Sequence, residues 1–276
     1  MPARFTYARG MPSEAQERYE EAAALAADPA EAAHALHLGA AVAWGRHAGN
    51  EAMRLYHAAA EAARRADDPR RAALELASAA ELVTNAPGIM SELPPPGEER
   101  ALLGEALALA ASDVRVEAAV LTVTTREDEF DPTYADLAER AVELAHRVGD
   151  ARLESHALDQ LTAVRLICGE FDDAVATVRR RLELLTPLAN DVEMAWEYSD
   201  TLHMAPMVYL AAGDLETARR YALTHVAAEP ESFKPWHGAA WRPWYTAVWA
   251  EAGYSQPCRT DAAASTGRGS SSVGIQ

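Results

Sequence analysis

Hydrophobic positions between residues 150 and 174 recur every three or four residues, as they do on one face of a helix. The apolar stripe consists of Leu153, Ala157, Leu158, Leu161, Val164 and Leu166. Gly169 follows the stripe, and glycine has the backbone freedom that the end of a helix needs. The pattern predicts a long helix, a turn at the glycine and the start of a second helix.

A second copy of this pattern occurs 44 residues later, in the segment YLAAGDLETARRYAL. Each copy has a glycine, an apolar residue two positions on and an alanine three positions further, at Gly169, Phe171 and Ala174 and again at Gly213, Leu215 and Ala218. Two copies of one helix–turn–helix unit indicate an array. We therefore expect an all-α fold, a superhelical array of antiparallel helical hairpins.

The same periodicity extends over most of the chain and predicts one helical-repeat domain over residues 13–254. The expected helices span about 13–28, 29–45, 50–67, 70–85, 98–111, 113–125, 133–148, 150–168, 171–186, 191–212 and 214–228. Residues 1–12 are expected to form a flexible lead, and the Ser- and Gly-rich residues 255–276 a disordered tail. Segment 85–97 holds three consecutive prolines, which cannot be helical. It predicts a fixed crossing loop or a hinge between two halves, and we favour the loop.

Composition and charge narrow the possible partners. No stretch approaches about 18 consecutive apolar residues, and the first ten residues lack the apolar core of a signal peptide. We therefore expect a cytoplasmic protein with no membrane contact. The net charge of −17 would repel a phosphate backbone, so we expect no direct nucleic-acid binding by this chain.

The two glycine-centred segments resemble the tetratricopeptide repeat, in which the glycine starts the turn and the alanine packs between the two helices. Their spacing of 44 residues exceeds the ~34 residues of that repeat. The resemblance therefore implies degenerate, lengthened repeats.

A finer resemblance covers residues 15–250 and rests on four segments: PGIMSELPPPGEERALLGEALALA, VEAAVLT, ELAHRVGDARLESHALDQLTAVRLICGEFDDA and TLHMA. Together they resemble the helical sensor region of large LuxR-type ATP-binding transcriptional regulators. In such regulators an ATPase precedes this region and a DNA-binding domain follows it. This sequence has no GxxxxGK[ST] loop and no basic recognition helix, so neither role is carried over.

Residues with catalytic or metal-binding potential are few. His34 and His37 have a zinc-like spacing without an evident third ligand, and we interpret them as surface histidines. Cys168 lies at the end of an apolar stripe without an adjacent base, which favours a buried structural thiol. The acidic segment 127–131 lacks the EF-hand pattern and predicts a solvated loop. We accordingly expect no catalytic residue, no cofactor and no metal.

One polar constellation is a candidate binding site. In the register set by the two glycines, His156 and Asp159 share a helix face with Asp200 and His203 of the next unit. Inner helices of such arrays line a concave groove, where these four side chains could hold a protein or a small-molecule effector. The alternative, which we favour, is two ordinary solvent-facing pairs.

Four tryptophans near the end of the array offer a second candidate. Trp236, Trp241, Trp244 and Trp249 could form an effector pocket, and we favour instead a cap packed on the last hairpin.

The functional prediction is a non-catalytic sensor or protein-interaction module of a transcriptional regulatory system. The alternative is a helical enzyme that uses the His/Asp groove for acid–base chemistry.

Overall fold

The computed structural model describes residues 12–110, 112–125, 134–189, 191 and 194–228, and within these ranges it contains helices and no strand. The α-helices are α2 (Pro12–Leu25), α3 (Pro29–Gly45), α4 (Gly49–Arg65), α5 (Pro69–Asn85), α6 (Glu98–Ala110), α7 (Val114–Thr124), α8 (Ala135–Val148), α9 (Ala151–Cys168), α10 (Phe171–Leu185), α11 (Ala195–Ala211) and α12 (Leu215–Ala228). Two short 3-10 helices, η1 (Pro87–Ile89) and η3 (Thr186–Leu188), follow α5 and α10. The prediction of an all-α chain is confirmed for these residues.

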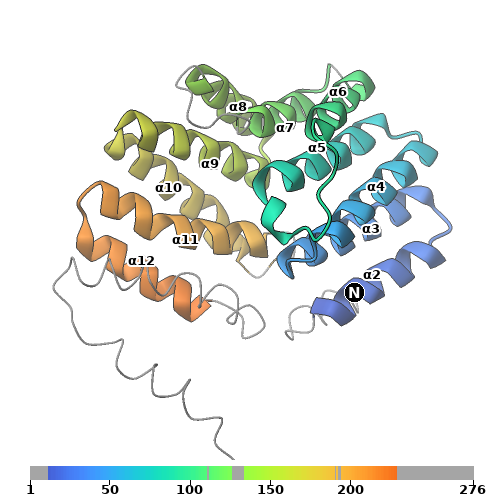
Figure 1. Ribbon diagram of the computed structural model, residues 1–276, viewed down its shortest axis with the longest axis horizontal. Helices are drawn as coiled ribbons and strands as arrows, with labels where there is room; N and C mark the ends of the chain where they lie inside the picture. The colour runs from blue at the N-terminus through green and yellow to red at the C-terminus, as the bar shows by residue number, and fades with distance from the viewer. Residues whose placement is uncertain (1–11, 111, 126–133, 190, 192–193, 229–276) are drawn as a thin grey trace, which may run out of the picture.

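The helices pack in chain order and bend round into an arc. Helix by helix, the chain follows one side of the arc from α2 to α7 and returns along the other side from α8 to α12 (Figure 1). Most helices pack against the next one in sequence, and α5, α7, α9 and α11 also pack against one another in that order. These four alternate helices therefore form a continuous inner row, and the candidate site lies along it.

Aspartates fix where several helices begin. The Asp28 and Asp68 side chains accept a hydrogen bond from the backbone N–H groups of Ala30 and Arg71, and each is followed by a proline in the first helical turn. Asp150 caps α9 in the same way and accepts bonds from two backbone N–H groups at 3.0 and 3.1 Å. In the structure α3 and α9 begin directly after Asp28 and Asp150, as predicted.

The corners at Gly169 and Gly213 have the same local geometry. Both glycines are left-handed, with φ of 77° and 81°. In each corner the next residue donates its backbone N–H to the carbonyl five positions earlier, at 2.8 and 2.9 Å. The corners after α3 and α4 make the same bond at 2.9 and 3.0 Å with His47 and Asp67, at φ of 61° and 55°, in the glycine's place. Those two corners have no glycine at the left-handed position and are therefore absent from the sequence pattern.

The proline-rich segment 85–97 is tied to the start of α4. The Asn50 side chain accepts backbone N–H bonds from Ser91 at 2.7 Å and Glu92 at 3.2 Å, and donates to the Glu92 carbonyl at 2.7 Å. Gly49 lies so close that a Cβ there would be 2.8 Å from the Ile89 carbonyl oxygen. These contacts hold the segment against the helix.

Some predictions are wrong in detail. Cys168 is exposed, because the last turn of α9 extends beyond the packed part of its stripe. Helix α11 begins at Ala195, four residues later than predicted.

Several predictions fall outside the described residues. They are the lead within residues 1–11, the acidic segment 127–131, the four tryptophans between 236 and 249, and the tail 255–276. Among the described helices, none combines the length and the apolarity that a membrane crossing requires.

Candidate functional site

A fully buried arginine lies at the centre of the candidate site. Arg181 of α10 is 0% exposed, and its guanidinium pairs with Glu197 and Asp200 of α11, both at 2.9 Å. It also pairs with Asp159 and donates to the Ser155 hydroxyl, both on α9. One cation therefore holds carboxylates from two helices of the inner row.

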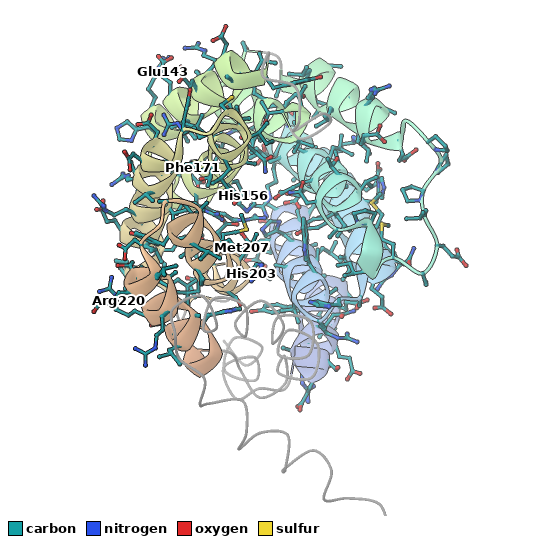
Figure 2. The ribbon with its side chains drawn as sticks, turned by 60° about the vertical axis from the view of Figure 1, so that its left-hand side comes forward. Glu143, His156, Phe171, His203, Met207 and Arg220 are labelled. Carbon is teal, nitrogen blue, oxygen red and sulfur yellow. The ribbon has the colours of Figure 1, made fainter. Side chains whose placement is uncertain are left out.

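His156 extends this network across the arc. Its Nδ1 lies 2.9 Å from a carboxylate oxygen of Glu81 on α5, and its Nε2 contacts Glu197 on α11. Arg152, one turn earlier on α9, lies 4.0 Å from the same Glu81 carboxylate. Helices α5, α9, α10 and α11 are thus joined through one set of charges. Figure 2 shows His156 directed toward the space between the two sides of the arc, whereas Arg220 lies on the outside.

The surroundings of His156 fix its protonation state. Burial alone would lower its pKa, but the carboxylates of Glu197 and Glu81 outweigh burial and raise the pKa to about 10. For Glu81 and Glu197 burial acts in the opposite direction, and the His156 cation still holds the pKa of both carboxyls below the usual value. At neutral pH the imidazole is therefore a cation between two carboxylates.

A pocket of about 210 Å³ adjoins this network, lined from α3, α5, α7 and α9. We call it the arginine pocket, and its charged lining includes Arg71, Arg115, Arg152, His156, Glu75 and Glu81. On its far side the buried Glu75 carboxylate contacts His37 Nδ1 at 2.9 Å and Arg71 Nε at 2.5 Å. The pKa of Glu75 is lowered because His37 and Arg71 outweigh the effect of burial.

A smaller pocket of about 70 Å³ lies on the other side of His156. We call it the carboxylate pocket, and its polar lining includes Glu81, Asp159, Glu197, Asp200, Asn85 and Gln160. Glu81 and His156 line both pockets, so the two adjoin at the imidazole.

Three of the four predicted site residues come together here. His156, Asp159 and Asp200 all line the carboxylate pocket. The interpretation as solvent-facing pairs is wrong for His156 and Asp159, whose side chains are only 13% and 17% exposed. His203 lines neither pocket, and its ring lies 5.7 Å from that of His225 on α12.

Sequence reasoning missed the cation that holds these groups. Arg181 ends a run of three arginines, which is usually a solvated surface. Its position on the helix indicates that it is buried, because Arg181 lies three residues after Val178 and four before Leu185, both fully buried. An arginine on the apolar stripe of a helix needs buried carboxylate partners.

The zinc-like pair separates in the structure. His37 is largely buried against Glu75, so its interpretation as a surface histidine is wrong, while His34 is exposed. No group of three or more His, Cys, Asp or Glu side chains in the described ranges could hold a metal ion.

The chain matches no model of a known protein family and no curated protein.

Proposed function

We propose that this chain is a non-catalytic binding module that holds an effector in the arginine pocket and the adjoining carboxylate pocket. The observation that carries the proposal is the buried charge network, which joins α5, α9, α10 and α11 beside both pockets. The resemblance of the chain to the sensor region of LuxR-type regulators supports a role in signal sensing. The shared geometry of the two glycine corners supports a superhelical array of lengthened tetratricopeptide-like repeats.

The protonation states favour binding over acid–base catalysis. A general acid or base works best with a pKa near the operating pH, and that of His156 is raised to about 10. Asp159 and Asp200 are both held by Arg181. Three residues of the alternative enzyme hypothesis are thus already engaged, His156 by Glu81 and Glu197, and Asp159 and Asp200 by that arginine.

The network also offers a way for effector binding to change the arrangement of the helices. An effector that fits one arrangement of the two sides of the arc better than another would shift the population toward that arrangement. Because Glu81 and Glu197 reach His156 from opposite helices, a small displacement of either helix changes the same set of ion pairs. The net charge of −17 favours a small molecule or a protein over nucleic acid.

A variant that fills the arginine pocket tests the proposal. Ala119 on α7 lines this pocket, and leucine there would occupy part of its volume. Ala108 on the neighbouring helix α6 is exposed and lines neither pocket, so Ala108→Leu is the matched control.

The measurement is the midpoint of thermal unfolding in the presence of a panel of small anionic, cationic and neutral metabolites. We expect at least one class to raise the midpoint of the wild type and of Ala108→Leu but not that of Ala119→Leu. A panel without effect on the wild type, or an equal response of Ala119→Leu, contradicts the proposal.

A further inference from the structure

We infer that the arginine pocket binds the carboxylate or phosphate group of a small anionic ligand through Arg71 and Arg115. The inference rests on the proposed function and adds the chemistry of the ligand. It starts from two arginines in the pocket lining, each with a buried guanidinium nitrogen that lacks a hydrogen-bond partner among the described residues.

Arg71 is held in place by one end of its guanidinium. Its Nε contacts the Glu75 carboxylate, which is itself 1% exposed and also contacts His37. Its Nη2 is buried without a partner in the described part of the chain. The ion pair with the buried Glu75 carboxylate therefore fixes a guanidinium that has a donor to spare.

Arg115 repeats this arrangement from the neighbouring helix of the inner row. Its Nη1 contacts the Asp150 carboxylate, which at the same time caps α9 through the backbone N–H groups of Arg152 and Leu153. Its Nε is buried, and no partner for it lies within the described ranges. A second guanidinium with a donor to spare is thus fixed in the pocket lining by a helix cap.

The charges of the pocket favour an anion over a cation. Its carboxylates are all engaged, Glu75 by His37 and Arg71, Asp150 by Arg115, and Glu81 by His156. Two arginine donors remain, and a buried donor without an acceptor is costly. Carboxylate and phosphate oxygens are the acceptors that guanidinium groups bind best. A cationic ligand would meet the arginines and find no uncommitted acid in this pocket.

The size of the pocket suits a small metabolite. Its volume of about 210 Å³ has room for several water molecules. A single bound ion would leave most of this space to water, whereas a short organic acid or phosphate ester would fill it.

Calorimetric titration of the full chain with three probes tests the inference. Succinate and inorganic phosphate supply the two anionic chemistries, and putrescine has the four-carbon length of succinate with both charges reversed. We expect the wild type to bind at least one of the two anions and not putrescine. The anion that binds more tightly shows whether the pocket prefers a carboxylate or a phosphate group.

Matched arginine variants locate the binding. Arg71→Gln and Arg115→Gln each remove one of the two donors, and a hydrogen bond to a charged group is strong enough that affinity should fall at least tenfold. Arg71→Lys keeps a cation beside Glu75 without the second nitrogen, and should weaken binding in a protein that stays folded. Arg70→Gln is the control, because Arg70 precedes Arg71 on α5 and its side chain is 52% exposed. It should bind as the wild type does.

The possible results separate the inference from the function. Binding of putrescine or a neutral metabolite with no binding of either anion overturns the inference and leaves the proposed function standing. Equal weakening in Arg70→Gln shows a general effect of surface charge and also overturns it. Failure of all three probes, together with no response to the metabolite panel, overturns both.

Discussion

The helices on the two sides of the arc bury the side chains at their centres by different means. Around α4 and α5 the core is apolar and rich in alanine, with Leu55 and Ala59 fully buried and Leu76 only 2% exposed. Between α9, α10 and α11 the residue at the centre is Arg181, at 0% exposure, and Glu197 beside it is 4% exposed. At its centre the first region replaces water by nonpolar contacts, although α5 also buries the ion-paired Glu75, and the second region replaces water by ion pairs beside an apolar cluster.

The difference matters because the two kinds of core fail differently. Apolar contacts are many and individually weak, so losing one leaves the others unchanged. A buried ion network is stable only while each charge keeps its partners, and removing one partner leaves another charge stranded. Sensitivity to charge should therefore be concentrated near the two pockets.

The largest expected effect is the loss of the central cation. Arg181→Met removes the partner of Asp159, Glu197 and Asp200 while keeping much of the side-chain volume. Uncompensated buried charges should lower the free energy of unfolding by about 3–5 kcal/mol. Denaturant unfolding at neutral pH measures it.

Arg179→Met is the control, two residues away on the same helix and exposed. Its effect should stay within about 0.5 kcal/mol. Similar losses in both variants would show that Arg181 acts as a general surface charge and not as the centre of a network.

On the other side of the arc we expect a loss of stability that does not depend on charge. Leu55 is 0% exposed in the apolar core, and Leu55→Ala should cost about 3 kcal/mol in free energy of unfolding through lost contacts and a cavity. The exposed Leu107 on α6 offers the control variant Leu107→Ala, with an effect below about 1 kcal/mol. Because no titratable group is removed, the cost of Leu55→Ala should be the same at about pH 6 and pH 9, and a cost that changes with pH would refute the contrast.

Sequence patterns predict the apolar side of this comparison better than the charged side. The three-to-four periodicity of alanine and leucine and the aspartate caps give nearly every helix boundary, because these are local properties. The register of the two glycine corners even selects His156, Asp159 and Asp200. It cannot identify Glu81 as a partner of His156, because the two are 75 positions apart and meet only through the bend of the chain. Arg181 is missed for another reason, since a triple arginine resembles a solvated face until its place on the apolar stripe is considered.

The third prediction concerns pH. The pKa of His156 is raised from about 6.5 to about 10, so the folded state binds this proton more tightly than the unfolded state does. Its contribution to stability is fully present below about pH 6.5 and is lost as the pH rises toward 10. His156→Gln should therefore cost about 3 kcal/mol near pH 6, the cost of breaking a buried ion pair, and the difference from wild type should shrink steadily on the way to pH 10.

The charged groups that face His156 set the range of that experiment. Glu81 and Glu197 have lowered pKa values, so their contribution to stability depends on pH in the opposite direction: it is present above about pH 4.5 and is lost as the pH falls below it. Denaturant unfolding between about pH 6 and pH 10 isolates the histidine. A difference between His156→Gln and wild type that stays constant over this range would mean that His156 is uncharged in the folded protein.

The smallest effect tests how closely the apolar side is packed, using two helical glycines as a pair. A Cβ at Gly49 would lie 2.8 Å from the backbone carbonyl oxygen of Ile89, and that oxygen belongs to a segment fixed by the Asn50 hydrogen bonds. Gly49→Ala should therefore destabilise the protein by about 1–2 kcal/mol. At Gly39 the nearest atoms, on Leu55 and Tyr19, are at an ordinary 3.5 Å, and alanine is the better helix former. Gly39→Ala should stabilise by about 0.5–1 kcal/mol in the same unfolding assay. If both variants gain stability, the proline-rich segment yields to an added methyl group and is not a fixed part of this core.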